Sequence, residues 1–418
     1  PRGHLIGGRR RPRGRPMAIG SINPFGAKPN GNNRNTNNNG SNSARGVELP
    51  RTGKGMIMEF RRRADLGSMK VYKQGKPAPS QSQSLKLSSN ENPFGPLPSV
   101  VKAIEEQTLG TLNRYPDMRG WRIVERIADK YGVGADNVIL GNGSGENIKQ
   151  LIEALAGPGD EVVFPWPSFQ GYPVMTACAG ATPVEVPLTK DLRHDIDALI
   201  AAVTPRTRLM IVNNPNNPTS TSVSKEEAER LIEGVPDDLI VLFDEAYFQF
   251  NTDPDASVAM DLFDAHPNVA VAHTFSKAYG LAGLRIGYCI AHEDVISEMM
   301  KARLPFSVTD MAQVAAVASM DAQDELDERV RAIVAERGRV VDAIRAMGWF
   351  LPEPEGNFFW VPLREQTAQA AQAFDEAKIS VRVTPGEGLR ITIGSKEAND
   401  AVIAIFEALN AQGVRSVR

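Results

Sequence analysis

The chain has 418 residues, which is more than one typical domain needs and enough for two packed domains with sizeable cores. Its composition is that of an ordinary globular protein, and no apolar run is long enough to cross a bilayer, which argues against a membrane-spanning protein. The two cysteines, Cys178 and Cys289, lie far apart in apolar contexts. We therefore expect reduced core residues, no disulfide framework and a cytoplasmic location.

Residues 1–63 differ from the rest of the chain in charge. They carry 14 Lys and Arg against 2 Asp and Glu, whereas the remaining residues carry 33 against 48. Residues 1–16 are rich in Arg and Gly, and residues 30–42 are almost entirely Asn, Gly and Ser, so we expect a disordered basic extension. Such an arm could bind nucleic acid, but aromatic residues for base stacking are nearly absent. We favour the interpretation that this segment is an upstream extension from a misplaced start. Met56, Met58 and Met69 are better candidates for the start residue.

Residues 64–98 are predicted to form an extended arm. This segment contains Tyr72-Lys-Gln-Gly-Lys76, then a polar linker, and then Asn90-Glu-Asn-Pro-Phe-Gly-Pro-Leu-Pro98. The prolines and the glycine of the last motif oppose regular structure. Such an arm could lie across the mouth of a substrate site.

The next pattern is a strand, a glycine-rich turn and a helix. It reads Val138-Ile-Leu-Gly-Asn-Gly143-Ser144-Gly145-Glu146. Backbone amides at the start of a helix bind phosphate, and Ser144 adds a hydroxyl. Glu146 stands where the last glycine of a dinucleotide motif would be, and no Gly-Lys-Ser/Thr follows. The pattern therefore predicts a phosphate site that belongs neither to a dinucleotide fold nor to a P-loop.

A buried parallel strand is predicted for the apolar run from Leu239 to Phe243. Asp244 follows it at the C-terminal end, which is the edge where open α/β sheets bind ligands. A carboxylate buried there requires a partner. A metal ion is one candidate, but the sequence nearby has no cluster of His or Cys, so we expect no metal site.

The most informative stretch is His273-Thr-Phe-Ser276-Lys277-Ala-Tyr-Gly-Leu-Ala-Gly-Leu-Arg285-Ile-Gly-Tyr288, which follows an apolar, strand-like run. Small and aromatic neighbours would desolvate Lys277 and lower its pKa, which gives the neutral amine that a Schiff-base nucleophile needs. Ser276 and Arg285 supply a hydroxyl and a guanidinium that suit a phosphate. The stretch thus predicts a reactive lysine beside a phosphate clamp.

The last third of the chain has a different pattern. Helical patterns over residues 292–303 and about 322–347 are followed by short strands near residues 357–361, 379–383 and 388–394, mixed with helices near residues 368 and 396. This mixture suggests a smaller α+β domain. We therefore divide the folded part into the arm of residues 64–98, a large domain of residues 99–303 and a small domain of residues 304–418.

Together these motifs resemble the pyridoxal phosphate (PLP) aminotransferases of fold type I. Within them, the chain looks most like the branch of histidinol-phosphate aminotransferases and the related aromatic amino acid aminotransferases. The resemblance runs from about Leu66 to Leu409. It implies an α/β fold with a mainly parallel seven-stranded sheet in the large domain, PLP as cofactor, amino acid and 2-oxo acid substrates, and a homodimer with active sites at the interface.

The resemblance also implies roles for individual residues. Lys277 would carry the cofactor and shuttle a proton, and Asp244 would keep the ring nitrogen protonated. Phe169 would stack on the ring, and Asn217 and Tyr247 would hold the phenolic oxygen. The implied phosphate ligands are Gly143, Ser144, Gly145, Ser276 and Arg285, joined by Tyr115 of the other subunit. The implied substrate contacts are Arg390, for the α-carboxylate, and Tyr72, Asn357 and Arg382.

The substrate follows from the resemblance less directly. The Tyr72 motif, the Asn90 motif and Pro218-Thr-Ser-Thr221 look most like the aromatic branch, which implies transfer between phenylalanine, tyrosine or tryptophan and 2-oxoglutarate. Histidinol-phosphate aminotransferase is the alternative, and threonine-phosphate decarboxylase is a further relative. A PLP-binding regulator with a nucleic-acid-binding tail is also conceivable, but no helix-turn-helix is recognisable.

Overall fold

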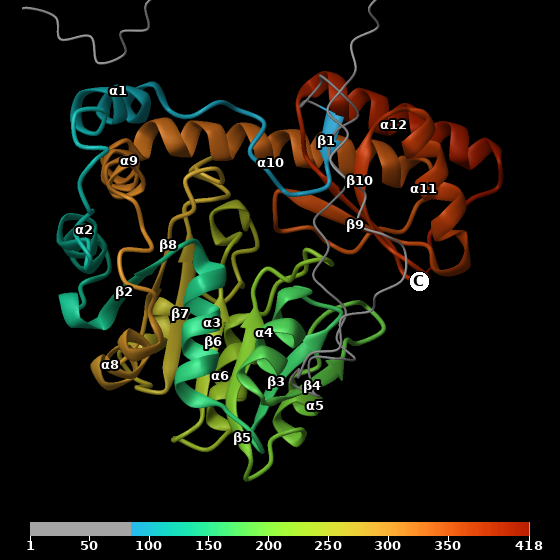
Figure 1. Cartoon of the computed structure of the whole chain (residues 1–418). Coiled ribbons are helices and arrows are strands. Elements are labelled where there is room, and N and C mark those ends of the chain that lie inside the picture. The colour runs from blue at the N-terminus through green and yellow to red at the C-terminus, as the bar shows by residue number, and fades with distance from the viewer. Residues whose placement is uncertain (1–84, 418) are drawn as a thin grey trace, which may run out of the picture. The chain divides into compact units, whose positions relative to one another are not determined.

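The computed structural model describes residues 85–417 (Figure 1), and the extension of residues 1–63 lies outside them. A seven-stranded sheet has the order β2-β8-β7-β6-β5-β3-β4. Its strands are β2 (Val138–Gly141), β3 (Glu161–Trp166), β4 (Thr182–Pro187), β5 (Thr207–Asn213), β6 (Ile240–Asp244), β7 (Val269–Thr274) and β8 (Gly287–Ile290). The neighbours from β4 to β7 pair in parallel, and β8 is antiparallel to both of its neighbours. The mainly parallel seven-stranded sheet is thus confirmed.

Helices cover both faces of this sheet. One face is packed by α3 (Ser144–Leu155), α4 (Gly171–Ala179) and α8 (Glu293–Ala302), and Figure 1 shows α3 and α4 in front of the strands. The other face is packed by α5 (Ile196–Ala201) and α6 (Lys225–Glu233). Because the central strands are buried on both faces, they are nearly uninterrupted apolar runs, as the sequence led us to expect.

The remaining helices and 3₁₀ turns lie before β2, between β6 and β7, or after β8. They are α1 (Pro98–Gln107), α2 (Trp121–Tyr131), α7 (Met260–Phe263), α9 (Asp310–Asp321), α10 (Gln323–Ala346), α11 (Thr367–Glu376) and α12 (Lys396–Ala411), with 3₁₀ turns at Ala135–Asn137, Phe248–Phe250 and Arg364–Gln366. The helical patterns predicted over residues 292–303 and 322–347 correspond to α8 and α10. Within residues 85–417, no helix is long and apolar enough to span a membrane.

A second sheet of four strands has the order β1-β10-β11-β9. Its strands are β1 (Lys86–Leu87), β9 (Phe358–Pro362), β10 (Ser380–Thr384) and β11 (Gly388–Thr392). The last three form antiparallel pairs, whereas β1 runs parallel to β10 and lies beside it in Figure 1. The arm therefore supplies a strand to the C-terminal sheet. Residues 90–97 have no helix or strand, as their prolines and glycine predicted.

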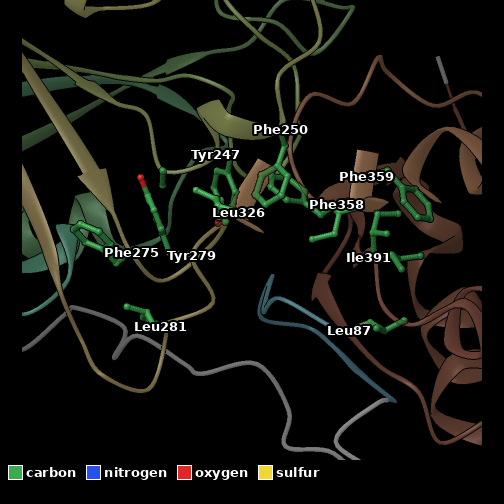
Figure 2. Packing of buried hydrophobic residues seen from close by; sticks show 14 of the residues in the cluster. Leu87, Tyr247, Phe250, Phe275, Tyr279, Leu281, Leu326, Phe358, Phe359 and Ile391 are labelled. Carbon is green, nitrogen blue, oxygen red and sulfur yellow. The ribbon is translucent and has the colours of Figure 1, made fainter. Parts of the chain in front are cut away.

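One hydrophobic cluster joins the two sheets. It contains Phe275 and Tyr288 from the large sheet's segments and Phe374 and Ile391 from the C-terminal part. Figure 2 shows Tyr247, Phe250 and Phe358 at the junction, where the rings of Tyr247 and Phe358 meet edge to face with centroids 4.8 Å apart. Tyr247 follows β6 directly, so this packing fixes the segment after β6 against β9.

Candidate active site

Two adjoining cavities open near the C-terminal ends of β5, β6 and β7. They share the lining residues Ser89, Phe169, Asn217, Tyr247 and Lys277. The glycine-loop cavity is further lined by Ser144, Gly145, Asp244, Ser276 and Arg285, among others. The two-arginine cavity is further lined by Trp166, Gln170, Arg382, Thr384 and Arg390, among others. Because five residues line both, the cavities form one site with two compartments.

Lys277 lies between the two compartments, on the loop after β7. Its Nζ donates hydrogen bonds to the backbone carbonyl oxygens of Ser89, at 3.0 Å, and Asn90, at 3.3 Å. Burial and, to a smaller extent, the nearby positive charge of Arg390 lower the pKa of Lys277 to about 7. A large part of the lysine is therefore neutral near pH 7, as a nucleophile requires.

Asp244 ends β6 and faces the glycine-loop cavity. The Tyr172 hydroxyl donates to its Oδ2 at 2.6 Å, while its Oδ1 is buried and has no hydrogen-bond partner among the described residues. Burial raises the pKa of Asp244 to about 6, although the bond from Tyr172 acts in the opposite direction. The carboxylate thus has one oxygen fixed and one available to a ligand.

An anion-binding arrangement lies at the start of α3. Nη1 of Arg285 donates to the Ser276 hydroxyl at 3.4 Å, and Nη2 donates to the backbone carbonyl of Asn142 at 3.4 Å. A Cβ on Gly143 would lie 2.5 Å from Arg285 Nη2, and Gly143 has a φ of +80°. Glycine is favoured there because this φ is strained for other residues, and its missing side chain lets the guanidinium approach the helix start. The first amides of α3, a hydroxyl and a guanidinium together can hold a phosphate.

The two arginines of the other compartment have polar neighbours already. Nη1 of Arg390 donates to Asn217 Oδ1 at 2.7 Å, and Nη2 donates to the carbonyl of Ser88 at 2.6 Å. Arg382 donates to the Gln170 side chain. The aromatic residues Trp166 and Phe169 line the same compartment. It can therefore receive a carboxylate and an apolar or aromatic group together.

The arm makes contacts near the site that the sequence did not indicate. Asn90 Nδ2 donates to the Tyr247 hydroxyl at 3.1 Å, and its Oδ1 accepts from Thr392 at 2.9 Å. Asn357 Nδ2 donates to the Asn90 carbonyl at 3.2 Å. The arm is thus tied to both sheets. The Asn90 motif was noticed in the sequence, but nothing there indicated which chain segments it contacts.

Four predicted site residues lie elsewhere or cannot be placed. Tyr72 is outside the described residues. Asn357 is buried, lines neither cavity and instead holds the arm. Tyr115 is 84% exposed, and its ring packs on Phe306 with centroids 4.8 Å apart. Gly143 itself lines neither cavity, although the next two residues line the glycine-loop cavity.

The glycine-loop cavity fits the chemical groups of PLP, the cofactor that the sequence implies. The free oxygen of Asp244 suits a protonated pyridine nitrogen, Phe169 offers an aromatic face, and the start of α3 suits the phosphate. The amine of Lys277 suits an aldehyde. Among residues 85–417, no group of three or more His, Cys, Asp or Glu side chains could hold a metal ion.

Comparisons with known proteins agree with this geometry. The model of the family "Aminotransferase class I and II" matches residues 82–406. The chain is 47% identical to the aromatic amino acid aminotransferase of Streptomyces avermitilis over 346 residues, which cover 82% of this chain and 96% of that protein. It is 45% identical to the aromatic amino acid aminotransferase of Rhodococcus opacus, over 86% of this chain and 99% of that protein.

Solved structures give the same fold. The histidinol-phosphate aminotransferase of Sinorhizobium meliloti in complex with pyridoxal-5'-phosphate superposes with a TM-score of 0.70 at 27% identity, covering 78% of this chain and 91% of that one. The aspartate aminotransferase of Thermus thermophilus with maleate has a TM-score of 0.70 at 23% identity, covering 78% of this chain and 91% of that one. This second comparison shows a similar fold and nothing more. The chain therefore belongs to the class I and II aminotransferases, and is a PLP-dependent enzyme of fold type I.

Proposed function

We propose that this aminotransferase transfers the amino group between phenylalanine, tyrosine or tryptophan and 2-oxoglutarate. The observation that carries the proposal is the composition of the two-arginine cavity, where Trp166 and Phe169 lie in the same compartment as Arg390. An aromatic amino acid has a carboxylate and a ring, and this compartment has a partner for each. The similarity to the curated aromatic aminotransferases supports the same substrate class.

The residues of the glycine-loop cavity would hold and tune the cofactor. When bound, PLP supplies an electron sink that stabilises a carbanion at the substrate's Cα. Asp244 keeps a proton on the ring nitrogen, and Asn217 and Tyr247 hold the phenolic oxygen. Arg285, Ser276 and the first residues of α3 hold the phosphate, as their position at the helix start suggests.

Lys277 would move the proton. Its amine has a pKa of about 7, so its neutral form can accept the proton from the substrate's Cα and return it at the cofactor's carbon. A general base works best when its pKa lies near the working pH, which this value satisfies.

Arg390 would bind the substrate's α-carboxylate. In the structure its two Nη atoms point to Asn217 Oδ1 and the Ser88 carbonyl, which are the kind of oxygen acceptors that a carboxylate presents. The substrate's carboxylate would replace the neutral Ser88 carbonyl with a charged acceptor, which binds a guanidinium more strongly. Arg382, paired with Gln170, would meet the distal end of the substrate, and Tyr72 would approach from the arm.

A homodimer would complete the site. Exposed apolar side chains within residues 109–121 and 304–306 support this arrangement: Leu109, Leu112, Tyr115, Met118, Trp121, Leu304 and Phe306. Gln313 Nε2 donates to the Asp117 carbonyl at 2.8 Å, which together with the contact of Tyr115 on Phe306 joins the two segments. A second copy would cover them and bring Tyr115 to the partner's phosphate site. We also propose a cytoplasmic location, since the sequence has two cysteines far apart and gives no sign of a disulfide framework.

Histidinol-phosphate aminotransferase is a second candidate. Arg382 favours it, because a second guanidinium in the two-arginine cavity could bind a substrate phosphate. The solved structure from Sinorhizobium meliloti is named for that activity and is 27% identical in sequence to this chain.

Single-turnover absorbance distinguishes the two substrates. The cofactor-loaded enzyme is mixed with phenylalanine or, separately, with histidinol phosphate, and the change in the cofactor band is followed. We expect rapid conversion by phenylalanine and little by histidinol phosphate, followed by recovery of the band with 2-oxoglutarate. A clear preference for histidinol phosphate would contradict the aromatic assignment, and conversion by neither would reject both substrates.

A further inference from the structure

The side chain of Tyr172 joins two groups that face the glycine-loop cavity, although Tyr172 lines neither cavity. It lies in the first turn of α4 and is completely buried. The Tyr172 hydroxyl donates to Asp244 Oδ2 at 2.6 Å. The rings of Tyr172 and Phe169 pack edge to face, with an interplanar angle of 83° and centroids 5.4 Å apart. Tyr172 therefore contacts both the carboxylate and the aromatic side chain of the cofactor compartment.

The backbone of this region fixes these contacts. The amide of Tyr172 donates to the Phe169 carbonyl at 3.0 Å, which places the two rings one turn apart. A Cβ on Gly171 would collide with the Phe169 ring, so only glycine leaves room for the ring in this position. Glycine at position 171 thus allows the Phe169 ring to approach its own chain and pack on Tyr172.

The carboxylate of Asp244 is held on one side only. Asn213 Nδ2 donates to its backbone carbonyl at 2.9 Å, and Tyr172 holds its Oδ2. The remaining oxygen, Oδ1, is buried and has no partner within the described part of the chain. Because Asp244 lines the glycine-loop cavity and its Oδ2 is already bonded, Oδ1 is the oxygen left to receive a group that enters the cavity.

We propose that Tyr172 is a positioning residue whose hydroxyl holds Asp244 with Oδ1 directed at the cofactor's ring nitrogen and thereby keeps that nitrogen protonated. The inference rests on the proposed role of Asp244, and not on which amino acid is the substrate. Tyr172 touches neither the substrate nor the cofactor, and acts through Asp244 and Phe169.

The charges around Asp244 agree with this role. Burial and the neighbouring carboxylate raise the pKa of Tyr172 well above its usual value, so its hydroxyl stays protonated and remains a donor. Besides Tyr172, the titratable groups that act on Asp244 are Glu245, the first residue after β6, and Lys277 on the loop after β7. A hydrogen bond to the ionised form lowers the pKa of a carboxyl group, so losing the hydroxyl would make Asp244 easier to protonate and a weaker partner for a cationic nitrogen.

The variant Tyr172→Phe tests the proposal, because it removes one hydroxyl and keeps the ring that packs on Phe169. The enzyme is loaded with PLP labelled with nitrogen-15 in the ring, and the chemical shift of the ring nitrogen is measured by NMR. We expect a shift toward the value of neutral pyridine, and a kcat lowered about ten- to hundredfold with little change in KM, since hydrogen bonds to charged groups contribute roughly 1.5–3 kcal/mol.

Tyr288→Phe is the matched control. Tyr288 is also buried, and its hydroxyl lies 3.0 Å from both His273 Nδ1 and the Tyr131 hydroxyl, away from Asp244. It should leave the nitrogen signal where it is in the unmodified enzyme. If Tyr172→Phe leaves the signal unchanged as well, the proposal is wrong. If Tyr172→Phe alone fails to fold or to load PLP, the hydroxyl has a structural role and the proposal is equally rejected.

Asp244→Asn separates this inference from the proposed function. It should move the ring-nitrogen signal at least as far as Tyr172→Phe does. An unchanged signal in Asp244→Asn would reject the proposed role of Asp244 itself. A changed signal in Asp244→Asn with an unchanged one in Tyr172→Phe would reject only the role of Tyr172.

Discussion

The two compartments of the site are built in different ways. Most groups of the glycine-loop cavity come from strand ends, loops and a helix start of the large sheet, and Asp244 and Arg285 are held by neighbours within that sheet's segments. The arm adds Lys86, Ser89 and Glu91 to the lining of this cavity. The two-arginine cavity combines β10 and β11 with the arm and the loop after β5, and Arg390 bonds to two of these segments at once. Asp244 and Arg285 are thus fixed within the segments of one sheet, while Arg390 depends on segments far apart in the chain staying together.

The largest expected effect comes from the residue between the compartments. Lys277→Ala removes the amine that would react with the cofactor and move the proton, so we expect single-turnover rates to fall more than about 10³-fold. Stopped-flow absorbance with phenylalanine measures the rates. Lys86→Ala is the control, because Lys86 lines the same cavity but is ion-paired with Glu91 at 2.7 Å. Comparable losses in both variants would contradict a specific role for Lys277.

Arg390→Lys tests the substrate compartment alone. Lysine keeps the charge but cannot form two parallel hydrogen bonds to a carboxylate. We expect kcat/KM for phenylalanine to fall about a hundredfold, equivalent to roughly 3 kcal/mol, while the affinity for PLP stays within a factor of about two. Steady-state kinetics and PLP titration give the two values. A parallel loss of PLP affinity would show that the compartments are not separable at this residue.

Asn90→Ala loosens the connection between the arm and both sheets. The buried hydroxyls of Tyr247 and Thr392 each lose a hydrogen bond to the Asn90 side chain. We therefore expect the free energy of unfolding to fall by about 1–3 kcal/mol. Urea denaturation measures this change. Asn92→Ala is the milder control, because Asn92 is only part-buried and donates to the Ala278 carbonyl. An equal decrease in the free energy of unfolding in both variants would mean that Asn90 contributes no more to stability than Asn92 does.

The smallest expected effect is a pH dependence of cofactor loading. Because the pKa of Lys277 is lowered to about 7, its amine is mostly neutral above that pH and mostly charged below it. We expect the rate of PLP binding to the cofactor-free enzyme to rise with pH and level off above about 7, changing up to about tenfold per pH unit below that point. Stopped-flow mixing between pH 6 and 9 would measure it. A rate that still rises at pH 9 would show that the lysine is not desolvated.

The sequence predicted the cofactor compartment better than the substrate compartment. The apolar runs that end at Asp244 and precede Lys277 identify buried parallel strands, and strand ends of such sheets lie together. Strand β4 was not predicted individually, because prolines occupy two of its six positions, which only an edge strand tolerates.

Contacts between distant segments could not be read from local patterns. The bond from Tyr172 to Asp244 and that from Asn90 to Tyr247 each link parts of the chain whose separation only the fold decides. Asn357 illustrates the same limit, since its motif did not indicate the hydrogen bond that its side chain donates to the Asn90 carbonyl of the arm. Spacing within a motif reveals which groups are present, whereas their partners depend on tertiary packing.

The pairing of β1 with β10 has a consequence for how the protein is made. Lys86 pairs with Ser380, so β1 cannot pair with β10 until almost the whole chain has been synthesised. At usual rates of translation this delay is on the order of half a minute. During this interval the large sheet can form on the ribosome, but the arm has no sheet to join. The carbonyl groups that the arm offers to Arg390 and Lys277 are therefore the last to be positioned, although they are synthesised early. The substrate compartment is thus the final part of the molecule to form.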